Sequence, residues 1–169
     1  MPVITNSDAQ GVVLQELELL RTRIIANMRT AGAVASGRTI ASLRVVPTDG
    51  GAALVTTGRM PFGVLETGRR GGRVPQGFTQ IIREWMAAKG IHAQRNGSQS
   101  QERADSSMAW AISRKIAREG TSLFRRGGRD TIYSQEIPKT IAAIDAKIGV
   151  LFDAYVDESI KLNNNEVGR

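Results

Sequence analysis

Glu66 is the residue best placed for chemistry, because it ends an apolar run between Leu65 and Thr67. A carboxylate there could act as a general acid or base, but it would need a second carboxylate or a histidine to work with. Neither lies nearby in the sequence. The alternative role is structural, in which Glu66 pairs with an arginine or accepts N–H groups of the loop that follows it. We expect this loop-anchoring role.

Other residue types that carry chemistry are scarce. His92 is the only histidine, and the chain has no cysteine. A lone histidine does not make a transition-metal site. The lack of cysteine excludes disulfides and thiolate metal sites, which fits a protein made in a reducing cytoplasm. We find no nucleophile with a base and no nucleotide-binding motif, and we therefore expect no catalytic residue, no metal, no cofactor and no enzymatic activity.

The string Arg-Arg-Gly-Gly-Arg occurs twice, and its six arginines are Arg69, Arg70, Arg73, Arg125, Arg126 and Arg129. The first copy is not a Walker loop, because the Gly-Lys-Ser/Thr ending is missing. Glycines beside the arginines disfavour regular structure. We therefore expect both strings to become ordered only when a negatively charged partner binds them.

Positive charge is concentrated in the middle of the chain. Residues 59–129 hold fourteen Lys and Arg against five Asp and Glu, whereas residues 130–169 are net −3, in a chain of net charge +7. Such asymmetry indicates a polyanion or an acidic partner surface. A solvated basic face is the alternative, but the excess of arginine over lysine favours interface or phosphate contacts.

A helix and a hairpin are predicted in the first third of the chain. Apolar residues at spacings of three and four predict a helix over about 8–30. β-Branched residues on either side of Asp-Gly and Gly-Gly predict a hairpin at 39–58. A further extended piece, Phe62 to Glu66, would lie beside it. We expect an α+β fold, with an antiparallel sheet covered on one face by the first helix.

Two more helices are predicted in the basic region, over about 76–89 and 101–119, with a polar exposed loop at 92–100 between them. Trp85 shares the apolar face of the first of these helices. We expect it in the core, since an indole in register with isoleucines is more often buried than free to stack on a base.

A long helix over about 138–162 is predicted at the end of the chain, with Pro138 in its first turn and a frayed segment after it. The 169 residues fit a single domain, 1–169, and this helix is longer than such a domain needs. We therefore expect it to act as an oligomerisation arm. Its candidate subunit-contact residues alternate at four and three, namely Ile141, Ile144, Ile148, Leu151 and Tyr155.

Two sequence blocks are similar to a known family. One runs from an apolar segment through Glu66-Thr67-Gly68 and a basic loop to the helix with Trp85; the other runs from Ala109 to Thr121 and ends in Ile-Ala-Arg-Glu-Gly-Thr. Together they cover roughly residues 52–125 and resemble the tail-completion (neck or minor tail) proteins of tailed bacteriophages. The order Thr67-Gly68 is the reverse of the family's Gly-Thr.

The resemblance implies a structural virion protein that forms a closed ring in the neck or upper tail. Such a head-to-tail connector is assembled in the bacterial host cytoplasm, and its partners are its own copies, portal or adaptor proteins, tail proteins and passing genomic DNA. We expect no membrane partner, since no apolar run approaches the ~20 residues that span a bilayer. In this interpretation the arginine strings grip acidic neighbouring subunits or DNA phosphates.

A free protein that binds nucleic acid without sequence preference is the alternative from another class. It would use the basic middle of the chain for contact with phosphates. The sequence offers two arguments against it, namely the lack of a recognisable reading motif and an expected shortage of exposed aromatic side chains.

Overall fold

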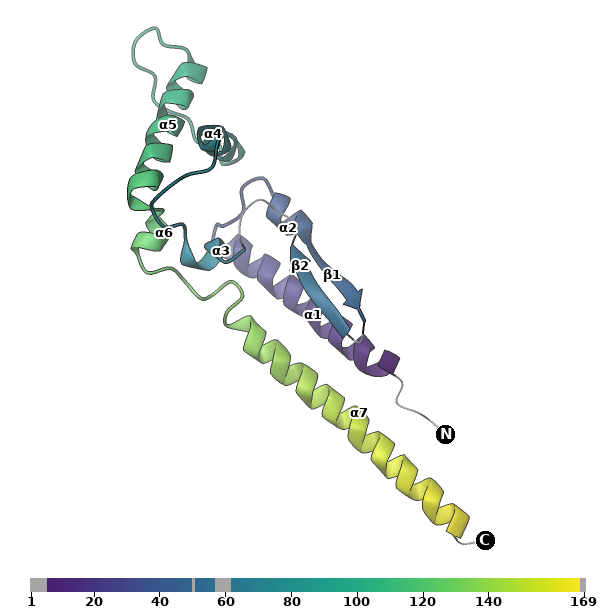
Figure 1. The fold of residues 1–169 in the computed structure, drawn as a ribbon. Helices are drawn as coiled ribbons and strands as arrows, with labels where there is room; N and C mark the ends of the chain where they lie inside the picture. The colour runs from purple at the N-terminus through teal and green to yellow at the C-terminus, as the bar shows by residue number, and fades with distance from the viewer. Residues whose placement is uncertain (1–5, 50, 57–61, 168–169) are drawn as a thin grey trace.

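The computed structural model describes residues 6–49, 51–56 and 62–167. It confirms an α+β fold with a hairpin and a long C-terminal helix (Figure 1). The elements are α1 (Asn6–Thr30), α2 (Arg38–Ser42), β1 (Leu43–Thr48), β2 (Gly51–Thr56), α3 (Val64–Thr67), α4 (Phe78–Ala88), α5 (Gln101–Glu119), α6 (Ser122–Arg125) and α7 (Glu136–Val167).

The hairpin lies along α1 and forms the first core with it (Figure 1). β1 pairs antiparallel with β2, from Leu43 opposite Thr56 to Thr48 opposite Gly51. The predicted hairpin is confirmed, although its first residues form the short helix α2. The buried core contains Leu20, Ile24 and Met28 of α1, with Leu43 and Ile132. Full burial of such side chains stabilises a fold by about 1.5–3 kcal/mol each.

Helices α4 and α5 build a second core at one end of the molecule (Figure 1). Phe78, Ile82 and Met86 recur every fourth residue and pack against Ala109 of α5. Trp85 is 40% exposed, so its predicted place in the core is wrong. Because three residues of one row already fill the contact with α5, the neighbouring row with Trp85 lies at the edge.

The extended piece predicted at Phe62 to Glu66 is also wrong, because residues 64–67 form the helical turn α3. Gly63 has helical backbone angles, and Glu66 N–H donates to the Gly63 carbonyl at 3.1 Å. The ring of Phe62 packs against that of Tyr133, with 5.2 Å between the centroids. A contact with a residue 71 positions away thus replaces the expected strand pairing.

Helix α7 runs antiparallel to α1, and its second half projects away from the end that carries α4 and α5 (Figure 1). Lys147 Nζ pairs with Glu16 Oε1 at 2.7 Å, and the buried Thr140 accepts a hydrogen bond from Arg23. The helix begins at Glu136, two residues before the predicted start, and residues 163–167 are helical although they were expected to be frayed. The last two residues of that predicted segment, 168–169, lie outside the described ranges. Within the described ranges, no helix is long and apolar enough to cross a membrane.

Candidate functional site

Glu66 lies at the junction between α3 and the segment that leads into α7. Its side chain is 2% exposed, and Oε1 accepts N–H groups of Ile132, Tyr133 and Ser134 at 2.8, 2.7 and 3.1 Å. Oε2 accepts the hydroxyl of Ser134. The predicted anchoring role therefore has a geometric basis, but the anchored segment is residues 132–134 and not the loop that follows Glu66.

The environment of Glu66 favours its charged form. Burial raises the pKa of Glu66, but the hydrogen bonds from the Ser134 hydroxyl and the three backbone N–H groups outweigh it and leave the pKa below its ordinary value. Burial raises the pKa of the neighbouring Tyr133, and the Glu66 charge raises it further. An ionised carboxylate surrounded by donors of its own chain is suited to holding backbone in place.

The two blocks that resemble the phage family meet in space through their glycines. Thr121 N–H donates to the Arg69 carbonyl at 2.9 Å, and Arg69 N–H donates to Thr121 Oγ1 at 3.0 Å. Gly68 and Gly120 have φ of 70° and 80°, which few other residues adopt. A Cβ on Gly68 would lie 2.4 Å from the Phe124 nitrogen, and one on Gly120 would lie 2.7 Å from the Arg69 oxygen. Glycine is therefore required at both positions.

The second arginine string is held at the same junction. Arg129 N–H donates to the Glu66 carbonyl at 2.8 Å, and a Cβ on Gly128 would lie 2.8 Å from that oxygen. In the first string, Gly72 N–H donates to the Ala117 carbonyl. The expectation that both strings need a partner to become ordered is thus corrected, because hydrogen bonds within the chain already fix their backbones.

Three of the six arginine side chains are engaged within the chain. Arg69 donates to the Arg73 carbonyl, and its guanidinium lies 5.5 Å from the ring centroid of Phe78. Arg125 pairs with Glu119 at 2.9 Å, and Arg129 donates to the Ala31 carbonyl at 3.1 Å. These three side chains contribute to the junction itself.

The other three arginines, Arg70, Arg73 and Arg126, have exposed side chains. None of them forms an ion pair with another residue that the structure describes. They come from both strings and remain the candidates for contact with a partner's acidic groups or with phosphates.

The candidate subunit-contact residues of α7 divide in a similar way. Ile144, Ile148, Leu151 and Tyr155 are half-buried and share the side of the helix on which Thr140 and Lys147 meet α1. Ile141 is 54% exposed. Contact of this seam with another subunit stays a prediction, and α1 of the same chain already covers part of it.

Exposed aromatic side chains are a feature that the sequence analysis missed. Trp110 is 54% exposed on α5, with the Arg114 guanidinium 5.0 Å from its ring centroid. Trp85 and Phe124 are each 40% exposed. The expected shortage of exposed aromatics is wrong, and one argument against nucleic-acid binding is thereby removed.

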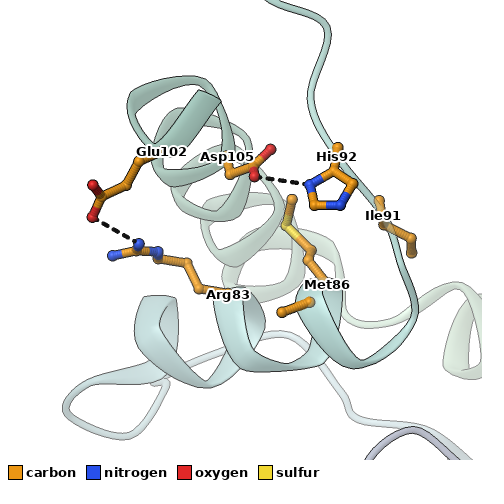
Figure 2. Close-up of a pocket in the computed structure, with 7 residues that line it drawn as sticks. Arg83, Met86, Ile91, His92, Glu102 and Asp105 are labelled. Carbon is orange, nitrogen blue, oxygen red and sulfur yellow. Dashed lines mark hydrogen bonds and ion pairs between the residues drawn. The ribbon is translucent and has the colours of Figure 1, made fainter. Parts of the chain in front are cut away.

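A pocket of about 290 Å³ lies beside His92, between α4 and α5 (Figure 2). His92 Nδ1 lies 3.1 Å from Asp105 Oδ2, while Asp105 Oδ1 accepts the Ala93 N–H at 2.7 Å and the Gln101 amide at 2.9 Å. His92 and Asp105 lie 13 positions apart, and no pattern in the sequence pairs them. Hydrogen bonds to Asp105 lower its pKa to about 2, and the Ala93 N–H has the largest effect, ahead of the side chains of His92 and Gln101.

The contacts of Asp105 suit a structural role, because they fasten the start of the 92–100 loop to α5. Within the described part of the chain, no group of three or more His, Asp or Glu side chains could hold a metal ion. A histidine and an aspartate also need a third group to perform acyl-transfer chemistry. No serine, threonine or lysine lines this pocket (Figure 2).

We expect Asp105→Asn to lower the melting temperature by a few degrees at neutral pH, because the amide cannot replace a carboxylate that accepts three hydrogen bonds. Because the pKa of Asp105 is lower in the folded than in the unfolded chain, its ionised carboxylate stabilises the fold fully at pH values above the unfolded pKa of about 4. This stabilisation is lost as the pH falls toward the folded pKa of about 2. Thermal unfolding at a series of pH values should show the two proteins converging in acid. Asp145→Asn, at an exposed position of α7, is the matched control, and equal effects of both changes would contradict the prediction.

The residues of the two sequence blocks build a single junction. Glu66, Gly68, Gly120 and Thr121 all belong to it. Ser134, which donates its hydroxyl to Glu66, gave no signal of its own in the sequence. A comparison with known proteins finds no matching family model, no matching curated protein and no matching solved structure.

Proposed function

We propose that this protein is a structural subunit of a tailed-bacteriophage virion. In this proposal it forms a closed ring in the neck or upper tail, joins the portal assembly of the head to the tail, and has no catalytic activity. Its partners are its own copies, portal or adaptor proteins and tail proteins, with genomic DNA passing through, and it is assembled in the host cytoplasm. The location in the virion and the closed ring are inferred from the resemblance of the two sequence blocks to the phage family.

The observation that carries the proposal is the apolar surface that a single copy leaves uncovered. Phe152 and Ile160 of α7 are 60% and 53% exposed, and Trp110 of α5 is 54% exposed. These side chains lie on elements at opposite ends of an elongated molecule (Figure 1). Exposed apolar side chains at two separate places favour contact with other proteins.

Electron microscopy tests this function directly. A tag on the chain should be found at the neck or upper tail of assembled particles, and particles without the chain should have heads that do not join tails. Arg70, Arg73 and Arg126 changed together to serine should leave folding intact and impair the joining. Particles that join normally without the chain would contradict the proposal.

A protein that binds nucleic acid without sequence preference remains the second candidate, and Trp110 favours it. Its exposed ring beside Arg114 is an arrangement on which a base can stack. Under this alternative, the purified chain should retard DNA of any sequence at low salt, and affinity should fall steeply with added salt. Trp110→Ala should then weaken binding about fivefold or more. Retardation that is absent at low salt would remove this candidate.

A further inference from the structure

The outer face of α5 carries a line of cationic and aromatic side chains. Arg103, Trp110 and Arg114 are spaced by seven and four residues, which places them on one side of the helix. All three are exposed. Neither arginine forms an ion pair with any other described residue, and Arg114 lies over the Trp110 ring. We call these three residues the α5 face.

The projecting half of α7 carries a line of opposite character. Phe152, Val156 and Ile160 recur every fourth residue and are 60%, 36% and 53% exposed. Asp153 and Asp157 follow them on the adjoining line, exposed and without an ion pair to the rest of the described chain. We call these five residues the α7 stripe.

The two surfaces match in charge. Residues 62–129, which include α4 and α5, hold thirteen Lys and Arg against five Asp and Glu. Residues 148–167 hold only Lys161 against four acidic residues. Opposite charges of this kind steer two surfaces together and fix their orientation.

The two surfaces also match in length. At a rise of 1.5 Å per residue, Arg103 and Arg114 are about 16 Å apart along α5, and Phe152 and Ile160 are about 12 Å apart along α7. The two arginines can therefore bracket the apolar line, with Trp110 between them available to pack on it. Aromatic and arginine side chains are the types most enriched at the centres of protein interfaces.

One copy cannot make this contact with itself. Helix α5 lies at one end of the molecule, and the projecting half of α7 points to the other end (Figure 1). We propose that the α7 stripe of one copy docks on the α5 face of a second copy. This inference rests on the proposed assembly of the chain and names the surfaces that form it. Because the two surfaces differ, the contact runs head to tail and generates a ring or an open chain.

Nucleic acid could bind only one of the two surfaces, the α5 face. Phosphates and bases would suit Arg103, Trp110 and Arg114, but the acidic α7 stripe would repel a polyanion and its apolar line would stay uncovered. A second copy of the chain covers both surfaces at once.

The test uses charge reversal in the full-length chain. Arg103→Glu with Arg114→Glu, and separately Asp153→Lys with Asp157→Lys, should each weaken self-association at least tenfold in sedimentation velocity. A chain that carries all four changes should recover it, because the opposite charges face each other again. Arg44→Glu, an exposed reversal on β1, is the matched control and should behave as the wild type. Circular dichroism confirms that each variant is folded.

The outcomes separate this docking from the proposed function. Rings that none of the reversals weakens would overturn the docking and leave the ring subunit in place. Recovery of self-association as open chains would support the docking and count against the ring. A wild-type chain that stays monomeric in sedimentation velocity would overturn the docking. The proposed function would then still be tested by locating the tagged chain in particles by electron microscopy. If charge reversal at Arg103 and Arg114 abolishes the retardation of DNA and leaves self-association unchanged, the α5 face binds nucleic acid and the docking is overturned.

Discussion

Replacing Gly68 with alanine should destabilise the protein by about 3 kcal/mol or more, whereas the same change at Gly127 should cost about 1 kcal/mol. Both glycines have positive φ, 70° and 85°. Gly68 also has ψ of −179°, a combination that is almost restricted to glycine. Its new Cβ would lie 2.4 Å from the Phe124 nitrogen, whereas nothing lies within 4 Å of a Cβ on Gly127. The difference between the variants therefore combines the steric contact at Gly68 with its less accessible backbone conformation.

Urea unfolding followed by circular dichroism gives the free energies needed for this comparison. Gly120→Ala should resemble Gly68→Ala, because its Cβ would approach the Arg69 oxygen from the other side of the same contact. Equal losses at Gly68 and Gly127 would contradict the close packing of the chain around Gly68.

Elements whose boundaries are set by local signals were predicted well from the sequence. Helix α5 begins and ends where predicted, because the Ser100 side chain accepts the Arg103 N–H and Gly120 ends the helix. The hairpin followed from β-branched residues around turn-forming residues. Local capping and turn chemistry decide both cases, so neighbouring residues carry the necessary information.

Features decided by distant contacts could not be predicted in this way. Residues 62–66 looked extended because they are apolar, yet Phe62 packs on Tyr133 and Glu66 binds residues 132–134. Periodicity placed Trp85 on a broad apolar face, but it cannot tell which row of that face the partner helix covers. For the candidate site, the arginines and an anchoring role of Glu66 could be predicted from the sequence, whereas the partners of each are visible only in the structure.

Replacing the buried carboxylate of Glu66 should have the second large effect on stability. Glu66→Gln should cost about 2–3 kcal/mol at neutral pH, because a charged acceptor is replaced by a neutral amide oxygen, which makes weaker hydrogen bonds to the backbone N–H groups, and the Ser134 hydroxyl must turn from donor to acceptor. One NH₂ group would then face either the N–H groups of residues 132–134 or the Ser134 hydroxyl. Glu18→Gln, at an exposed position of α1 paired with Arg21, is the control and should change stability by less than about 0.5 kcal/mol.

The pH dependence of the same variant distinguishes loss of charge from simple misfit. The pKa of Glu66 is below its ordinary value of 4.5 in the folded protein, so its ionised form stabilises the fold fully above that value. This contribution is lost as pH falls through the lower folded pKa. The gap in unfolding free energy between wild type and Glu66→Gln should therefore be constant from pH 7 to about 5.5 and narrow progressively in more acidic solution. Urea unfolding across that range measures the gap, and a gap that stays constant into acid would mean that shape, and not charge, fixes residues 132–134. A narrowing gap would identify the charge of Glu66 as the contribution that holds the start of α7 against α3.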